Sequence, residues 1–194
     1  MSYDSSATRA RLLAAAYDEF VRVGLAGARV DRIAAAASAN KQGIYAYFGS
    51  KEGLFDAVLG ARLRVLADVV PFRPGDLPGY TGALFDELTA DPGLQRLTQW
   101  KMLERPGASE QERDAHLSKA GALAEAHGVG LATAMDAMMV ALAAAQSWSM
   151  TAPTIRDPTG DDPDRRLAAH RAAIVASVGA ITAALLDGPD AEIS

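Results

Sequence analysis

The stretch that decides the fold is Ala28–Phe55, which reads ARVDRIAAAASANKQGIYAYFGSKEGLF. It contains two short segments with helical spacing of apolar residues, joined by a tight turn, and then an aromatic cluster and the start of another helix. A short helix followed after three or four residues by another is the layout of a helix-turn-helix, whose second helix enters the major groove of DNA. The stretch therefore predicts a DNA-binding switch and not an enzyme.

The residues of this stretch divide into those that pack and those that can reach DNA. Asn40, Lys41, Gln42 and Gly43 form the first turn of the second motif helix, where side chains reach base edges. Gly43 lacks a side chain, which would let the backbone approach DNA. Tyr45 and Tyr47 each carry a hydroxyl that can bond a phosphate or meet a thymine methyl, and Lys51 begins the next helix, whose free N–H groups attract phosphate.

Each of these polar residues also has an ordinary interpretation. Lys41 and Lys51 can be solvated lysines, and Gln42 can be a surface residue instead of a partner for adenine N6 and N7. The two tyrosines can be core aromatics. Because Ile44 and Phe48 already take the inward positions of the helix, we expect at least one tyrosine to face DNA.

The segment IAAAASANKQGIYAYFGSKEGLFDAVL resembles the N-terminal domain of the TetR family of transcriptional repressors. The matching features are the Ile-Ala-Ala run, the Ile-Tyr-x-Tyr-Phe cluster and the Gly-Ser-Lys-Glu-x-Leu-Phe helix start, and the resemblance runs from Thr8 to Leu59. It implies repression by occupancy of a palindromic double-stranded DNA operator. It also implies a homodimer, whose last two helices pair in a four-helix interface, and a ligand pocket in the C-terminal part.

The sequence departs from the family's usual choices at three positions. Arg29 stands where the family often has a capping Thr or Ser, so that cap is lost unless Asp31 replaces it, but the arginine gains a charge that can meet phosphate. Ser38 stands where a turn glycine is usual, which predicts slight backbone strain. Tyr47 occupies a position often taken by His. The fold does not depend on these positions, whereas the detailed DNA contacts do.

Charge and composition agree with DNA contact confined to the N-terminal end. Residues 1–53 carry seven Lys or Arg against five Asp or Glu, whereas residues 54–194 carry twelve against nineteen. We therefore predict a helix-turn-helix domain over 1–53 and a ligand-binding and dimerisation domain over 54–194. The chain has no cysteine and shows no signal pattern over residues 1–10, and its most apolar run, Leu131–Ala145, is too short to span a bilayer. We expect a cytoplasmic protein with no membrane association, metal or cofactor.

Apolar spacing and helix-breaking residues predict an all-α chain without a sheet. Ser5, Ser6 and Thr8 are predicted N-caps of the first helix, and Gly24 and Gly27 are predicted to end it. The expected helices are Arg9–Val23, Val30–Ala37, Asn40–Phe48, Lys51–Val70, Pro78–Ala90, Pro92–Arg105, Ser109–His127, Leu131–Thr151 and Asp164–Leu186. The first three form a head with the helix-turn-helix, the last two are the expected dimer helices, and Gly188–Ser194 is an expected frayed tail.

Large flexible and aromatic residues in the C-terminal body suit an apolar or amphipathic small-molecule effector. The residues that we expect to contact such a ligand are Trp100, Met135, Met139 and Trp148. His116 and His127, with Gln99 or Gln146, are candidate polar anchors. For any one of these residues, ordinary core packing or solvation is the alternative.

Other functional classes have weaker support in the sequence. Asp161, Asp162 and Asp164 lack the glycine and terminal glutamate of a calcium loop, so they favour a solvated loop and the start of a helix. Gly128-Val129-Gly130 follows no strand, which argues against a dinucleotide site. An all-α hydrolase or transferase and a helical partner-binding module remain as alternatives, but neither explains the layout of Asn40–Lys51.

Overall fold

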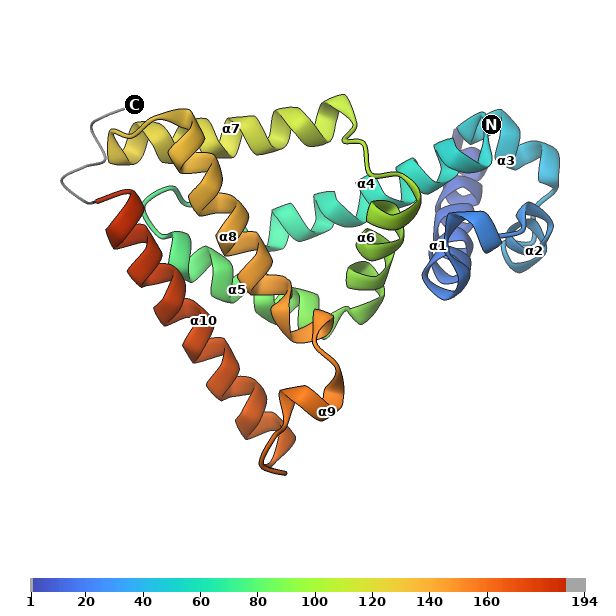
Figure 1. The fold of residues 1–194 in the computed structure, drawn as a ribbon. Helices are drawn as coiled ribbons and strands as arrows, with labels where there is room; N and C mark the ends of the chain where they lie inside the picture. The colour runs from blue at the N-terminus through green and yellow to red at the C-terminus, as the bar shows by residue number, and fades with distance from the viewer. Residues whose placement is uncertain (1, 188–194) are drawn as a thin grey trace. The chain divides into compact units, whose positions relative to one another are not determined.

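The computed structural model describes the backbone of residues 2–187 and the side chains of residues 5–187. Over residues 2–187 it contains ten α-helices and no strand, so the all-α prediction is confirmed (Figure 1). The helices are α1 (Ser2–Gly27), α2 (Val30–Ala36), α3 (Lys41–Phe48), α4 (Lys51–Val69), α5 (Leu77–Ala90), α6 (Pro92–Glu104), α7 (Glu110–His127), α8 (Leu131–Met150), α9 (Pro153–Arg156) and α10 (Pro163–Leu185). The expected frayed tail, residues 188–194, lies outside the described residues.

The chain forms two compact units. The first unit comprises residues 1–65 and 93–107, and the second comprises residues 66–92 and 108–194. The first unit therefore contains the helix-turn-helix together with nearly all of α6, a helix that lies far along the sequence from the motif. The functional boundary expected between residues 53 and 54 stays a prediction.

The core of the first unit is built from the inward faces of five helices. Phe20 of α1 and Phe55 of α4 meet edge to face, with ring centroids 5.0 Å apart. The helix-turn-helix contributes Ile33, Ala34 and Ile44, and α6 contributes Leu97, all fully or almost fully buried. Burial of this many apolar side chains supplies the main driving force for the unit. The inward positions predicted for Ile44 and Phe48 of α3 are thus confirmed, since Ile44 is buried and Phe48 packs against the same core.

Three details of the predicted helices differ in the structure. Helix α1 begins at Ser2, so Ser5, Ser6 and Thr8 lie inside it and are not its N-caps; Thr8 instead accepts a hydrogen bond from Arg11. The helical backbone is interrupted at Gly24, but the helix resumes and ends at Gly27. The short α9 falls in a segment expected to be irregular, although its proline at the first turn is a favourable helix start.

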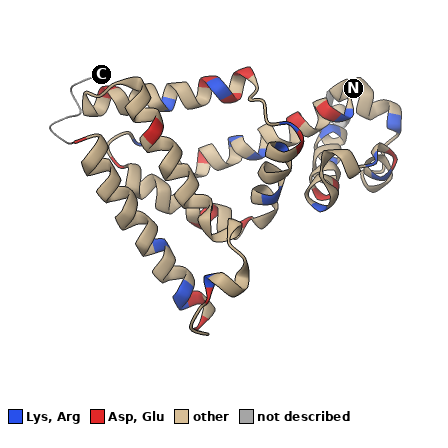
Figure 2. Ribbon diagram, in the orientation of Figure 1, with Lys and Arg blue, Asp and Glu red and all other residues tan. Residues whose placement is uncertain are grey.

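In the second unit, α5 packs against α8 and α10, and α7 packs against α8. Gly82 of α5 makes part of this packing possible, because a Cβ there would lie 3.0 Å from Cγ2 of Val175. Helix α10 is unusual: a window of it has a mean hydropathy of 1.4, yet only 17% of that window is buried. By length and composition alone it is the one described single helix that could cross a membrane, and Figure 2 shows few charges on it after its first turns.

Candidate nucleic-acid interface

The turn between α2 and α3 holds a residue in the left-handed backbone region. Ser38 has a φ of 50°, and no other described residue except glycine has a positive φ. The amide of Ala39 nevertheless donates to the carbonyl of Ala34 at 2.9 Å, which keeps the turn tight. A side chain in this conformation costs energy that a glycine avoids. The structure thus agrees with the strain expected at Ser38.

Asn40 is the N-cap of α3, and not part of its first turn as expected. Its side-chain oxygen accepts a hydrogen bond from the amide of Gly43 at 2.6 Å, which satisfies one of the free donors at the helix start. A Cβ on Gly43 would lie 3.1 Å from that oxygen. Gly43 therefore gives room to the cap as well as to any ligand near the helix N-terminus.

The face of α3 away from the core is polar and aromatic. Ile44 is fully buried, whereas Tyr45 and Tyr47 keep 45% and 40% of their surface exposed. Lys41 and Gln42 are exposed as well. Both tyrosines thus lie outside the core, and they extend the polar first turn of α3 into a continuous exposed surface.

The three basic residues predicted to contact DNA differ in their partners. Lys41 Nζ lies 3.0 Å from Asp31 Oδ1, and this hydrogen bond and charge raise the pKa of Lys41. Lys51 Nζ donates to the carbonyls of Ala26 and Ala28 at 3.4 and 3.3 Å. Some of its N–H donors are therefore already used to hold the end of α1 and the residues before α2. Among the described residues, the Arg29 side chain has no hydrogen bond or ion pair. Arg29 is therefore the motif cation most available to a phosphate.

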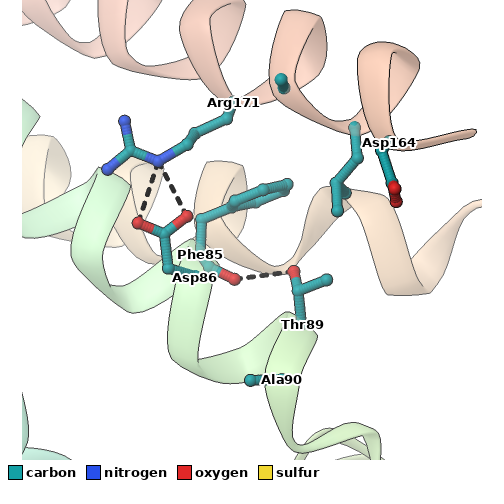
Figure 3. A pocket seen from close by; sticks show the side chains of 8 residues that line it. Phe85, Asp86, Thr89, Ala90, Asp164 and Arg171 are labelled. Carbon is teal, nitrogen blue, oxygen red and sulfur yellow. Dashed lines mark hydrogen bonds and ion pairs between the residues drawn. The ribbon is translucent and has the colours of Figure 1, made fainter.

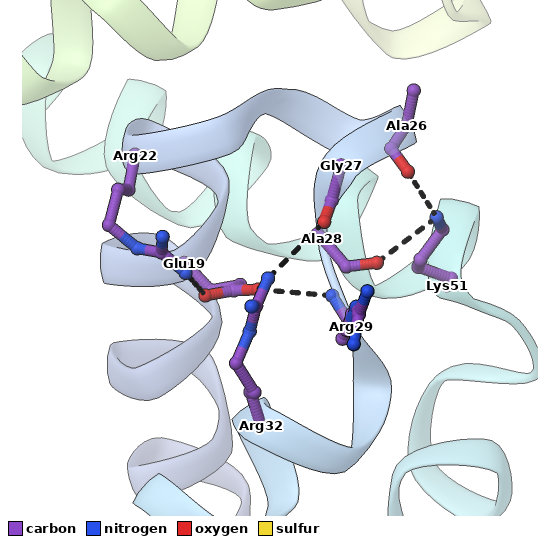
Figure 4. Close-up of polar contacts among 8 residues, drawn as sticks. All are labelled: Glu19, Arg22, Ala26, Gly27, Ala28, Arg29, Arg32 and Lys51. Carbon is purple, nitrogen blue, oxygen red and sulfur yellow. Dashed lines mark hydrogen bonds and ion pairs between the residues drawn. The ribbon is translucent and has the colours of Figure 1, made fainter.

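Glu19 of α1 organises the start of α2 (Figure 4). Its carboxylate is 7% exposed, accepts hydrogen bonds from the Arg29 amide at 3.0 Å and from Arg32 Nε at 2.8 Å, and pairs with Arg22. Burial by itself would raise the pKa of Glu19, but these hydrogen bonds and the charge of Arg22 outweigh it and lower the pKa. Glu19 thus satisfies the amide of the N-cap residue Arg29, whereas the Arg29 side chain makes no cap hydrogen bond and Asp31 pairs with Lys41.

Helix α6 holds the end of α1 through side chains. Trp100 donates its indole N–H to the carbonyl of Val21 at 3.4 Å, and Glu104 accepts from the amides of Leu25 and Ala26 at 2.7 and 3.1 Å. These contacts need Gly24, because its φ is 70° and a Cβ there would lie 2.8 Å from the Trp100 ring. Arg105 adds an ion pair to Asp56 of α4 at 2.6 Å.

Sequence reasoning did not identify Glu19, Glu104 or Arg105. Glu19 had a local signal, because it precedes Phe20 and stands three residues after Ala16, and so lies on the buried side of α1. Glu104 and Arg105 had none, because their partners lie about fifty to eighty residues away in sequence. Only the folded chain brings these charges to the backbone and carboxylate groups that they bind.

The second unit contains a mostly apolar pocket of about 410 Å³ between α5 and α10 (Figure 3). Arg171 closes one side of it, with Nε 2.7 and 2.9 Å from the two carboxylate oxygens of Asp86. The Thr89 hydroxyl donates to the Phe85 carbonyl at 2.7 Å. The lining residues are Phe85, Asp86, Thr89, Ala90, Asp164, Leu167, Ala168 and Arg171.

The structure places the residues predicted to bind a ligand elsewhere. Met135, Met139 and Trp148 lie on α8 of the second unit, with Met139 exposed and the others half-buried, and Trp100 lies in the first unit. None of the four lines the α5–α10 pocket. Whether they contact a ligand stays a prediction.

The histidines considered as polar anchors have structural partners. His127 contacts the Asp187 carboxylate at 2.8 Å and the Pro74 carbonyl at 3.2 Å, and His116 contacts the Glu112 carbonyl at 2.7 Å. Asp162 caps α10 by accepting from the Arg165 amide at 2.9 Å, as expected for the start of that helix. Within the described residues, no group of three or more His, Cys, Asp or Glu could hold a metal ion.

Two family models match the chain. Residues 12–58 match the model described as bacterial regulatory proteins, tetR family, and residues 76–179 match the tetracyclin repressor-like C-terminal domain. The first match includes the whole helix-turn-helix, and the second includes the α5–α10 pocket. Together they account for both units of the chain.

Known proteins resemble most of the chain. The HTH-type transcriptional repressor SCO4008 of Streptomyces coelicolor is 41% identical over 160 residues, which are 79% of this chain and 83% of that protein. The crystal structure of the transcriptional regulator SCO4942 from the same organism has a TM-score of 0.76 at 35% identity, covering 90% of this chain and 97% of that one. The regulator SCO7222 of Streptomyces coelicolor shares the fold at 20% identity, with a TM-score of 0.64 over 92% of this chain and 97% of its own.

Proposed function

The chain belongs to the TetR family and is a helix-turn-helix transcriptional repressor, and we propose that a small-molecule ligand releases it from a palindromic operator. The family is not enzymatic, which excludes the alternative that the chain is a hydrolase or transferase. The observation that carries the proposal is the exposed polar face of α3, opposite a packed core, in a unit that also exposes the Arg29 side chain. The protein would act in the cytoplasm, where its DNA lies.

In this proposal α3 is the recognition helix. Gln42 and the amide of Asn40 read base edges, and Tyr45 and Tyr47 contact phosphate or a thymine methyl. Arg29, Lys41 and Lys51 contact phosphates, which contribute most of the affinity without specifying sequence. Lys41 would exchange its exposed ion pair with Asp31 for a phosphate, a small cost because exposed pairs contribute little. Gly43 has no side chain and so lets the backbone of α3 approach the DNA major groove.

The proposed operator is palindromic because the repressor is proposed to act as a homodimer through α8 and α10. Both helices expose apolar side chains, among them Met139 and Val140 of α8 and Leu185 of α10. A monomer rarely leaves such faces in water, and a second copy would cover them. Two recognition helices would then read half-sites roughly 34–36 Å apart.

The effector is proposed to bind in the second unit, where the α5–α10 pocket is one place for it. Its size and apolar walls suit a small apolar or amphipathic molecule. Ala90, which lines the pocket, is followed after one residue by Pro92, the first residue of α6. Because Trp100 and Glu104 of α6 hold α1, a ligand that shifts the end of α5 can reach the DNA-binding unit along the chain. Contacts from Trp100, Met135, Met139 and Trp148 remain part of the proposal.

Selection of genomic fragments by the purified full-length protein tests the DNA-binding proposal. We expect a palindromic fragment, from upstream of its own gene, to be retained at moderate salt and to shift in a gel. Selection no better than random DNA would contradict the repressor mechanism. A selected site with no dyad symmetry would contradict only its palindromic form.

Three variants separate the proposed roles in the motif. Lys41→Ala should weaken binding to all sequences and reduce the slope of log affinity against log salt by about 1. Gln42→Ala should instead change base preference, and an unchanged preference would remove it from base readout. Asp31→Asn, which frees Lys41, should strengthen binding. Arg113→Ala on exposed α7 is the matched control and should change none of these.

Release by ligand is tested with compounds that dissociate the operator complex in a gel. Binding of such a compound should raise the melting temperature of the free protein, because a ligand that binds only the folded state stabilises it. Ala168→Phe, which fills the α5–α10 pocket, should abolish both effects while DNA binding persists. If both effects survive in that variant, the ligand binds elsewhere, and the α8 residues become the next candidates.

A further inference from the structure

Trp148, near the end of α8, lies among three basic side chains. The guanidinium carbon of Arg156 from α9 lies 5.0 Å from the indole centroid, and that of Arg166 from α10 lies 5.7 Å from it. The imidazole of His170, one turn further along α10, is 5.2 Å from the indole, centroid to centroid. Helices α9 and α10 thus bring two permanent positive charges and a titratable ring to one aromatic side chain of α8.

The two arginine charges have no carboxylate partner. No described Asp or Glu lies within ion-pair distance of Arg156 or Arg166, although the loop before α10 contains several aspartates. Asp157 instead accepts from the amides of Gly160 and Asp161, and Asp162 accepts from the amide of Arg165. The acidic groups of this loop therefore hold its own backbone and leave the adjacent arginines unneutralised.

Arg156 also has an unsatisfied buried donor. Its Nε has almost no accessible surface and no hydrogen-bond partner in the described structure. Buried donors are nearly always paired in folded proteins, because leaving one unpaired costs roughly 1–3 kcal/mol. An acceptor brought by a ligand would remove that cost.

Stacking on an aromatic ring leaves an arginine able to bind an anion. A guanidinium interacts with the indole through its face, whereas its N–H donors point outward in its own plane and match a carboxylate. The Trp148 indole N–H has no partner among the described residues. On the opposite side, His170 Nε2 is 2.9 Å from Ser147 Oγ and its ring is 5.8 Å from Phe85, so aromatic surface continues beyond the charges.

We propose that Arg156, Arg166 and Trp148 form a binding site for an aromatic carboxylate. The carboxylate accepts hydrogen bonds from the arginines, and the ring of the ligand lies against the aromatic surface of Trp148 and His170. None of these three residues lines the α5–α10 pocket, but Trp148 is also one of the residues proposed to contact the effector. Binding of a carboxylate here does not depend on DNA binding.

The charge environment of His170 gives an independent readout. Burial, and to a lesser extent the charge of Arg166, lower the pKa of His170. A carboxylate bound to Arg166 offsets that charge, and a ring packed on His170 buries the imidazole further, so a bound ligand should change the environment of His170. A purely structural cluster of arginine and tryptophan predicts no such change when an anion is added.

Titration of the full-length protein with benzoate tests the site. Trp100→Phe leaves Trp148 as the only tryptophan, so its fluorescence reports on this site alone. We expect a saturable fluorescence change with benzoate and none with benzylamine, which has the same ring and the opposite charge. Calorimetry on the unaltered protein should give the same affinity, which guards against an effect of Trp100→Phe.

Variants locate the binding. Arg156→Gln and Arg166→Gln should each weaken benzoate binding by at least about tenfold, the effect of losing one hydrogen bond to a charged group. Arg165→Gln, which removes an exposed neighbouring charge, is the matched control and should leave the affinity unchanged. If a glutamine variant fails to fold by circular dichroism, Arg156→Lys, which keeps the charge and loses the planar donor pair, should still weaken binding.

Two results would overturn the proposal. One is the absence of saturable benzoate binding by both fluorescence and calorimetry. The other is binding with equal affinity in folded Arg156 and Arg166 variants, which would place the ligand elsewhere. Proton NMR of the His170 ring should show its signals shifting as benzoate is added, and unchanged signals would equally contradict binding at this site.

Discussion

At the residue scale, Glu19 shows how one buried carboxylate joins the start of α2 to α1. The Arg29 side chain makes no cap hydrogen bond, and the Glu19 carboxylate accepts from the Arg29 amide, which is a different donor from the amides that a capping hydroxyl would satisfy. The same carboxylate binds the side chains of Arg22 and Arg32. One side chain thus adds three polar contacts to the apolar packing of α2 on α1, which is an arrangement that local capping does not provide.

Glu19→Gln should destabilise the folded protein by about 1–3 kcal/mol at neutral pH, because it replaces charged hydrogen bonds by neutral ones. The pKa of Glu19 is lowered on folding, so its contribution is complete above the pKa of an unfolded glutamate, about 4.3. It is lost as the pH falls through the lower folded value. Urea unfolding from pH 7 down to pH 3 should show the variant and parent converging in stability. A constant difference across that range would contradict the ionised role of Glu19.

Ser38→Gly should stabilise the protein by about 0.5–1 kcal/mol, because glycine adopts the positive φ of this turn without strain, although it loses more chain entropy on folding. Chemical denaturation measures the change. Ser118→Gly on exposed α7 is the control, and there the same substitution should destabilise by several tenths of a kcal/mol. Equal signs at the two positions would argue against strain at Ser38.

At the element scale, the sequence predicted nine of the helices because their apolar spacing and their breaks are local properties. Asp162 lies at the start of α10 as predicted, and both it and Ser50 accept a hydrogen bond from the amide three residues ahead. The start of α1 was misplaced because the polar residues before Arg9 are compatible with a helix interior as well as with a cap. The exposed α3 surface was predictable for the same local reason, whereas the hydrogen bond from the Arg29 amide to Glu19 was not.

Helix α6 illustrates what local pattern cannot supply. Its amphipathic sequence predicted a helix, but not that Trp100 and Glu104 would hold the end of α1. The partners in these hydrogen bonds are 78 or 79 residues apart in sequence, and only folding brings them together. The packing of α6 explains why residue 24 is a glycine, because a side chain there would collide with the Trp100 ring.

Gly24→Ala should destabilise the first unit by about 2 kcal/mol or more, since its φ of 70° and ψ of −177° lie in a region that is nearly exclusive to glycine. The added Cβ would also displace Trp100, so operator affinity should fall. Gly121→Ala in α7 is the control: a Cβ there meets nothing within 4 Å, and the change should stabilise the helix by about 1 kcal/mol. Guanidinium denaturation followed by circular dichroism compares the two. A neutral Gly24→Ala would show that α1 does not need this kink.

At the scale of the whole molecule, the exposed surface of α10 is the feature that one chain leaves unexplained. Helix positions that lie on one side of α10 are occupied by exposed alanines, namely Ala169, Ala172, Ala173, Ala176, Ala180, Ala183 and Ala184. Small residues at this spacing let another helix approach closely, and they contribute little to folding of the single chain. Their apolar character also explains why α10 is apolar enough, as well as long enough, to cross a membrane. A second copy of the chain accounts for both properties, and that proposal has a direct test.

Ala176→Glu, in the middle of this surface, should convert the proposed dimer into a monomer, because pairing would bury two like charges near the symmetry axis without partners. Sedimentation should show half the parent mass, with α-helical content retained. Operator affinity should fall by at least about 100-fold, since each head would bind its half-site alone. Ala115→Glu on exposed α7 adds the same charge away from the surface and should change neither mass nor affinity. If Ala176→Glu remains a dimer with full operator affinity, the subunits must pair through a different surface, and the apolar face of α10 would require another partner.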